Sequence, residues 1–194
     1  MIKKYILPAA LLLCLGLLLA GCAIGDRPGS TGKAVEFADP NLEEALRAAL
    51  EKPAGELTVE DLSGLEELNA PVRDIADLGG LEHAVNLRYL NLYRNRITDL
   101  SPLSSLEKLE VLILSDNDIA DISPLGELVN LRELNLSQNR IRDLSVVQWK
   151  KLASLENLDL RYNYLRLSDA DTAGILDAIR QAGVNFQVEP TYYD

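Results

Sequence analysis

The sequence has few of the residues on which enzyme active sites most often depend. Among 194 residues there are one His, two Cys, one Met and one Trp, and only 5% are aromatic. The single His is His83. Cys14 lies within an N-terminal hydrophobic stretch and Cys22 near its end. Serine–histidine and cysteine–histidine nucleophiles are therefore not expected, nor is a disulfide.

Motifs that bind metals or nucleotides for catalysis are also missing. No H-E-x-x-H, G-x-x-x-x-G-K-[ST] or G-x-G-x-x-G pattern occurs, which removes the signatures of zinc peptidases, NTPases and dinucleotide-binding enzymes. The 30 acidic residues leave a carboxylate pair for glycoside hydrolysis open by residue type alone. Because no such pair is placed by a motif, we expect no enzymatic activity and no cofactor.

The charge is unbalanced towards acids, with 30 Asp and Glu against 19 Lys and Arg and a net charge of −11. Loss of residues 1–21 would remove two Lys and no acid, which leaves −13. Such a surface repels nucleic acid and anionic lipid headgroups. We therefore expect no nucleic-acid partner, and we expect a monomer.

The first residues have the layout of an export signal. Lys3 and Lys4 precede an uncharged, Leu-rich stretch. It includes Leu19-Ala20-Gly21-Cys22, which resembles a bacterial lipobox and implies cleavage before Cys22 and a lipid on its thiol. The alternative is an uncleaved anchor helix, because the stretch is long enough to span a bilayer. Either form places the product at a bacterial membrane, outside the cytoplasm, and at the outer membrane if the cell has two membranes.

A 22-residue spacing dominates the remaining sequence. Of the 194 residues, 39 are Leu, an excess that indicates one environment repeated many times. Leu87, Leu90, Leu92, Asn95 and Ile97 recur 22 residues later as Leu109, Leu112, Leu114, Asn117 and Ile119, and again as Leu131, Leu134, Leu136, Asn139 and Ile141. Near Trp149 the spacing lengthens by two residues, and the next unit then follows the same pattern and contains Asn163. An earlier unit begins at Leu65 and has Arg73 in place of the Asn. Five units are present.

The spacing within a unit predicts a short strand. Leu90 and Leu92 share one face, while Tyr89, Asn91 and Tyr93 point to the other. An Asn that follows the strand can satisfy backbone groups of the turn with its amide. Successive units would therefore stack a structural ladder of Asn95, Asn117, Asn139 and Asn163.

This pattern resembles the leucine-rich repeat family, and in particular the 22-residue repeats of bacterial internalins. The resemblance covers residues 65–167. It implies an α/β fold: a right-handed leucine-rich repeat solenoid with a concave parallel sheet, convex 3₁₀ turns and helical N- and C-terminal caps. It is specific for the fold and weak for the partner.

Both open ends of a solenoid need caps. Asp39 and Pro40 predict the start of a helix, and Thr58 with Asp61 predicts a second short helical turn. A helical stripe after Asp169 and an alternating strand over 184–188 close the other end. The expected organisation is a signal peptide at 1–21, a lipidated Cys and flexible tether at 22–34, an N-terminal cap at 35–64, five repeats at 65–167 and a C-terminal cap at 168–194.

The outward residues of the predicted sheet are the candidate binding site. An aromatic and aliphatic cluster on two adjacent strands is typical of a protein contact, although Tyr, Val and Ile also simply suit strands. The candidate partner-binding residues are Tyr89, Asn91, Tyr93, Val111, Ile113, Glu133 and Asn135. A second candidate is the set Tyr162, Tyr164, Tyr192 and Tyr193, for which end-cap packing is the alternative.

A column of carboxylates also follows the repeat, at Asp77, Asp99, Asp121 and Asp143. It raises a calcium site as a hypothesis. We favour the simpler interpretation that each Asp accepts hydrogen bonds from the following turn, with no metal.

The sequence thus favours a lipid-anchored, extracytoplasmic protein that binds a protein or peptide through its concave face, with adhesion or another cell-surface interaction as one form of this function. The alternatives are a binder of cell-wall glycan or peptidoglycan and a structural component of the envelope.

Overall fold

The computed structural model describes residues 32–189. The predicted signal peptide, Cys22, and Tyr192 with Tyr193 lie outside the described residues. None of the helices within 32–189 is long and apolar enough to cross a membrane.

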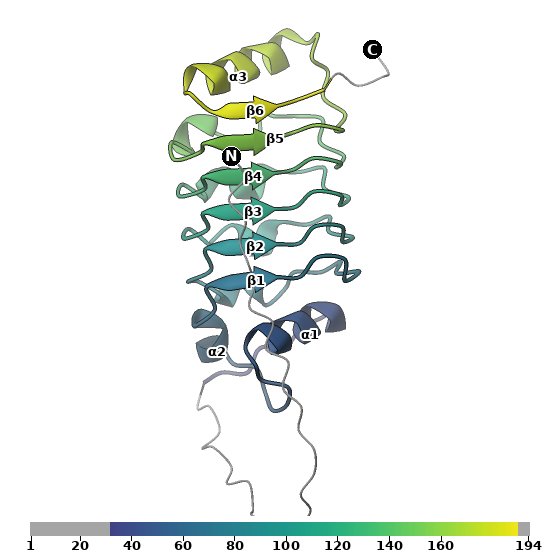
Figure 1. The fold of residues 1–194 in the computed structure, drawn as a ribbon, viewed down its shortest axis with the longest axis vertical. Coiled ribbons are helices and arrows are strands. Elements are labelled where there is room, and N and C mark those ends of the chain that lie inside the picture. The colour runs from purple at the N-terminus through teal and green to yellow at the C-terminus, as the bar shows by residue number, and fades with distance from the viewer. Residues whose placement is uncertain (1–31, 190–194) are drawn as a thin grey trace, which may run out of the picture.

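Six short parallel strands form one sheet, stacked in chain order (Figure 1). They are β1 (Glu67–Asn69), β2 (Tyr89–Asn91), β3 (Val111–Ile113), β4 (Glu133–Asn135), β5 (Asn157–Asp159) and β6 (Asn185–Gln187). The central residue of each of the first five strands is a buried Leu, and these Leu side chains pair in register from Leu68 to Leu158. The expected strands of the repeats are therefore present, and a sixth strand extends the sheet.

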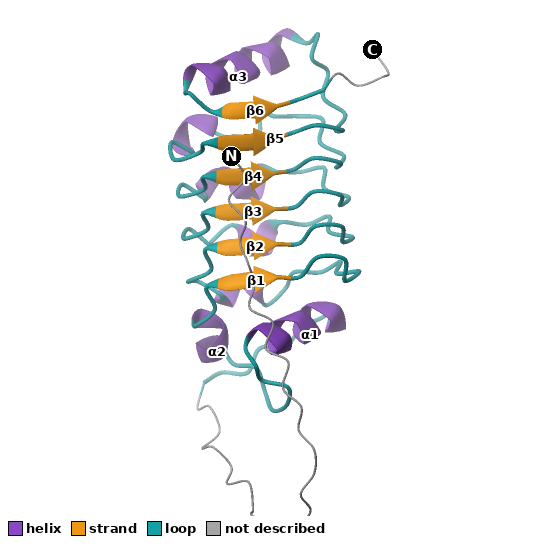
Figure 2. Cartoon of the chain, viewed as in Figure 1, coloured by secondary structure: helices purple, strands orange, loops and turns teal. Residues whose placement is uncertain are grey.

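Short 3₁₀ helices return the chain behind the sheet (Figure 2). They are η1 (Leu81–His83), η2 (Ser101–Leu103), η3 (Ser123–Glu127) and η4 (Trp149–Lys151). Pro occupies an early position in η2 and η3, where its missing N–H costs no helical hydrogen bond. The core between sheet and turns consists of one layer of Leu and Ile per coil. The two-residue slip falls at η4, where Trp149 Nε1 donates to the Leu144 carbonyl over 2.8 Å.

The N-terminal cap contains α1 (Pro40–Ala49) and α2 (Val59–Ser63). Asp39 is the N-cap of α1, and its carboxylate accepts from the backbone of Asn41 at 2.8 Å. Thr58 and Asp61 form a reciprocal capping box at the start of α2. Leu42, Leu46 and Leu62 are fully buried, so the two helices cover the Leu layer that the first coil would otherwise expose.

The C-terminal cap consists of α3 (Ala170–Gln181) followed by β6. Leu176 and Ile179 on α3 are buried and join the same core. Phe186 of β6 takes the place of the repeated Leu and pairs with Leu158. The predicted fold class, with a parallel sheet, 3₁₀ turns and helical caps, is confirmed.

The residue three positions after the end of each of the first five strands has a left-handed backbone. These residues are Val72, Arg94, Asp116, Gln138 and Tyr162, with φ between 54° and 58°. The backbone N–H of Val72 donates to the carbonyl of Tyr93 in the next coil over 2.8 Å, and the N–H of Arg94 donates in the same way to Ser115 over 2.9 Å. A β-branched side chain is strained in this conformation, so the hydrogen bond between coils must hold Val72 in place.

Candidate functional site

The outward side chains of the strands form the sheet face, the concave face of the solenoid. Tyr89 and Asn91 flank buried Leu90 on β2, and Val111 and Ile113 flank buried Leu112 on β3. All four outward side chains are half-buried. Six of the seven predicted binding residues therefore lie on the outward side of a strand. The seventh, Tyr93, lies two residues after Asn91, the last residue of β2.

The apolar part of this face spans two adjacent strands. Tyr89 pairs with Val111 and Asn91 pairs with Ile113 in the parallel register, at the roughly 4.8 Å spacing of neighbouring strands. Tyr93 follows at the end of β2 and is 37% exposed. We call Tyr89, Tyr93, Val111 and Ile113 the apolar half of the sheet face.

The other half is polar and contains a hollow of about 240 Å³. Glu133 and Asn135 of β4 line it together with Asn157 and Asp159 of β5, and Ile113 borders it from β3. We call Glu133, Asn135, Asn157 and Asp159 the polar half. Asp159 accepts from Arg161 through both carboxylate oxygens, with the closest contact at 2.6 Å.

Hydrogen bonds, some between coils and some within one coil, order several polar side chains of the sheet face. Asn91 Nδ2 donates to Asn69 Oδ1 over 2.9 Å, and Asn185 Nδ2 donates to Asn157 Oδ1 over 3.1 Å. Asn135 Oδ1 accepts from the backbone N–H and the hydroxyl of Ser137. Because these side chains are already held, a partner would meet a face with little rotamer entropy left to lose.

The ladder of asparagines lies behind the sheet face and is not available to a partner. Asn95, Asn117, Asn139 and Asn163 are each at most 8% exposed. In Asn117, Nδ2 donates to the Leu92 and Leu114 carbonyls, each over 3.0 Å, while Oδ1 accepts from the Ile97 N–H over 3.0 Å. Each amide thus forms hydrogen bonds with the backbone of two successive coils, so the asparagine column holds neighbouring coils together.

The Asp column forms local turns. Asp77, Asp99, Asp121 and Asp143 each accept from the backbone N–H two residues ahead, at 2.7 to 2.8 Å. The backbone N–H of Ser101 and then its hydroxyl hold the pKa of Asp99 below its usual range, and the hydroxyl and N–H of Ser145 do the same for Asp143. No group of three or more His, Cys, Asp or Glu within residues 32–189 could hold a metal ion.

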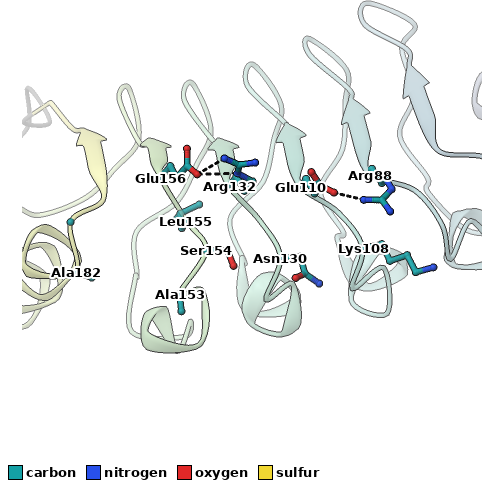
Figure 3. A pocket seen from close by; sticks show the side chains of 11 residues that line it. Arg88, Lys108, Glu110, Asn130, Arg132, Ala153, Ser154, Leu155, Glu156 and Ala182 are labelled. Carbon is teal, nitrogen blue, oxygen red and sulfur yellow. Dashed lines mark hydrogen bonds and ion pairs between the residues drawn. The ribbon is translucent and has the colours of Figure 1, made fainter.

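A wider hollow of about 860 Å³ lies beside the sheet, where the chain enters the strands (Figure 3). Its charged side chains pair between coils: Arg88 with Glu110, and Arg132 with Glu156 at 2.6 Å. Lys108 Nζ donates to Asn86 Oδ1 over 2.6 Å. These cations are already engaged, so the hollow does not favour an anionic ligand. The prediction from sequence missed this charge row, although Arg88, Glu110 and Arg132 alternate in sign at a spacing of 22.

The other predicted aromatic candidates within the described residues lie outside the strands, and Tyr162 is next to Arg161, which lines the hollow of the sheet face. Tyr162 and Tyr164 follow β5 and are 56% and 45% exposed. The Arg142 guanidinium lies 5.4 Å from the centroid of the Tyr164 ring. His83 is half-buried in η1, with Nε2 3.9 Å from the carboxylate of Glu82.

Comparison with known proteins finds the leucine-rich repeat fold that the structure shows. Three overlapping segments, 85–127, 107–149 and 129–172, match the family model described as leucine-rich repeats in two copies. The internalin inlF from Listeria monocytogenes is 30% identical, with a TM-score of 0.62, over 79% of this chain and 52% of its own. A search of curated proteins gives no match.

Two further structures share the fold at lower identity. The functional domain of InlJ from Listeria monocytogenes is 21% identical over 84% of this chain and 46% of its own, with a TM-score of 0.52. A leucine-rich repeat protein from Leptospira interrogans is 24% identical over 68% of this chain and 39% of its own, with a TM-score of 0.50. The InlJ domain includes a cysteine ladder, whereas the ladder in this chain is built from asparagine.

The 22-residue coils, the six-stranded parallel sheet and these matches define a leucine-rich repeat protein. Within that class the chain is an internalin-like leucine-rich repeat protein, as the sequence resemblance indicated. It spans about half the length of the inlF structure, 52%.

Proposed function

We propose that this chain is a lipid-anchored, extracytoplasmic bacterial protein that binds a protein or peptide partner through its sheet face, without catalysis. The observation that supports the binding function is the apolar half, where Tyr89, Val111 and Ile113 lie partly exposed on two paired strands. Partly exposed aromatic and aliphatic side chains on a rigid sheet contribute strongly to association, because their burial releases water at little conformational cost. The internalin-like fold also suggests a protein-binding or adhesion function.

The triple variant Tyr89→Ser, Tyr93→Ser, Ile113→Ser is expected to abolish partner capture and to leave the thermal midpoint nearly unchanged, because none of these side chains fills the core. Capture is measured with the full chain immobilised as bait, and the midpoint by circular dichroism. The matched control is Val85→Ser, Val129→Ser, Val146→Ser, which removes three exposed apolar side chains outside the strands, at 47%, 39% and 42% exposure. A large fall in the midpoint, or equal capture by both variants, would contradict the assignment.

Membrane attachment is proposed from the lipobox-like motif that ends at Cys22. Cys22→Ala is expected to move the protein from the membrane fraction to the soluble extracytoplasmic fraction, since the thiol that would carry the lipid is removed. The measurement is cell fractionation followed by immunoblotting. Cys14→Ala is the control and should stay with the membrane. If Cys22→Ala stays there as well, the uncleaved anchor is the correct alternative.

A further inference from the structure

The sheet face changes chemical character between two adjacent strands. In the parallel register, Val111 of β3 pairs with Glu133 of β4, and Ile113 pairs with Asn135. An apolar surface therefore meets a carboxylate and an amide across one strand spacing of about 4.8 Å. A partner that covers both halves needs an apolar group and a polar group at a matching separation.

Glu133 supplies the unbalanced charge on this face. It is exposed, and no ion pair to it is found within residues 32–189. The preceding residue, Arg132, lies close enough to Glu133 for Coulombic attraction, but its guanidinium makes its hydrogen bonds with Glu156, at 2.6 and 2.9 Å. Asp159, the other acid of the hollow, is neutralised by Arg161. The hollow thus has one net negative charge, from Glu133.

The size of the hollow favours a single side chain. Its volume of about 240 Å³ lies below the roughly 300–1,000 Å³ of sites that enclose a small-molecule ligand. Its polar lining includes the Glu133 carboxylate, the Asp159–Arg161 ion pair and the side-chain amides of Asn135, Asn157, Asn185 and Gln187. Asn135 Oδ1 already accepts two hydrogen bonds from Ser137, whereas Asn157 Oδ1 accepts one, from Asn185, and keeps a second lone pair. Oxygen acceptors beside an unpaired carboxylate suit an ammonium or a guanidinium.

We propose that the partner is an extended peptide segment with a Lys or Arg side chain in this hollow, against Glu133, and an aromatic or aliphatic side chain two positions away on the apolar half. This inference rests on the proposed binding function. The distance fits, because side chains on the same side of an extended chain are two residues, about 6.6 Å, apart, which lies between the roughly 4.8 Å from β4 to β3 and the roughly 10 Å from β4 to β2. The net charge of −11 adds long-range attraction for a basic segment.

The test is selection of random peptides displayed on phage against the immobilised full chain. Enriched peptides are expected to have Lys or Arg two positions from an aromatic or aliphatic residue. Against Glu133→Gln, the basic residue should no longer be enriched while the apolar one is retained. The matched control is Glu107→Gln, which removes one exposed acid outside the strands and should select the same peptides as the parent chain.

The best peptide is then synthesised and titrated by calorimetry. Glu133→Gln is expected to weaken its affinity about tenfold, and added salt should reduce the difference between the two proteins. Enriched peptides without a basic residue, or unchanged affinity for Glu133→Gln with an unchanged circular dichroism spectrum, would overturn this inference. In that case the binding function stands if the triple Ser variant loses the same peptides. No enrichment over a bare surface would overturn peptide binding itself, and this inference with it.

Discussion

Leu112→Ala is expected to lower the free energy of unfolding by about 2–5 kcal/mol, the range for a buried Leu whose removal leaves a cavity. Leu112 is fully buried at the centre of β3 and pairs in register with Leu90 and Leu134. Those neighbours cannot move into the space without leaving their own layers, because every coil repeats the same packing. We therefore expect little relaxation around the cavity and an effect in the upper part of the range.

The measurement is urea unfolding of the full chain followed by circular dichroism. The adjacent substitution Ile113→Ser is the control, since it changes the same strand on its outward side and should cost about 1 kcal/mol or less. Equal losses for the two variants would show that the outward side chains belong to the packed core. That result would also weaken the apolar half as a binding surface.

The 22-residue spacing predicts the coils because each repeat of a solenoid contacts only the repeats before and after it. The spacing of Leu90, Leu92 and Asn95 indicates which positions of a repeat are buried, and the same positions are buried in the repeats that follow. The caps are predictable for a different reason. Asp39 before Pro40, and Thr58 before Asp61, are local signals that need no tertiary knowledge.

The repeat spacing does not predict features that depend on the conformation of the turns or on the packing of side chains from neighbouring coils. Adding 22 places Ser115 and Ser137 in the outward column of Tyr93, yet both are buried, at 6% and 7% exposure. Val72 has a left-handed backbone that a β-branched residue disfavours, so its own propensity predicts the opposite. The hollow beside Glu133 is formed by side chains of neighbouring strands, and its shape depends on how these side chains pack together, which the residue types alone do not reveal.

One long-range contact that sequence reasoning misses is made by Asp39. Its Oδ1 accepts from the Asn41 and Leu42 N–H groups at 2.8 and 3.4 Å, as an N-cap should. Its Oδ2 accepts from the N–H groups of Ala76 and Asp77, at 2.7 and 3.2 Å, more than 30 residues away. One carboxylate, only 8% exposed, therefore joins the cap helix to the first repeat.

Asp39→Ala is expected to lower the free energy of unfolding by about 2–4 kcal/mol. Loss of the N-cap contributes about 1 kcal/mol, and the unsatisfied N–H groups of the first repeat add roughly 1–3 kcal/mol. Asp39→Asn should lose less, because its single carbonyl oxygen can still accept on one side while its NH₂ meets donors on the other. Glu36→Gln removes an exposed acid from the same cap and is expected to change stability by less than about 0.5 kcal/mol.

The same carboxylate makes the cap sensitive to acid. Burial raises the pKa of Asp39, but hydrogen bonds from the backbone of Ala76, Asp77, Asn41 and Leu42 outweigh it and hold the pKa below its ordinary value. A depressed pKa in the folded protein means that the stabilisation is complete above the pKa of the unfolded chain, about 3.9, and is lost as pH falls through the folded value. Asp61 behaves alike: burial raises its pKa, but hydrogen bonds from Lys52 and Thr58 outweigh burial and hold the pKa below its ordinary value.

The stability difference between the parent chain and Asp39→Asn should therefore be full at about pH 7 and shrink below about pH 4, because the protonated Asp39 no longer presents two charged acceptors. Urea unfolding at a series of pH values measures it, with Glu36→Gln as the reference that keeps the parent's pH dependence. A difference that stays constant into acid would mean that the carboxylate acts by its shape alone. Since the N–H groups of Ala76 and Asp77 depend on Asp39, acid should loosen the contact between the N-terminal cap and the first repeat. Asp99 and Asp143 in later coils also have lowered pKa values, but they are exposed and accept only within their own turns, so their protonation should cost less.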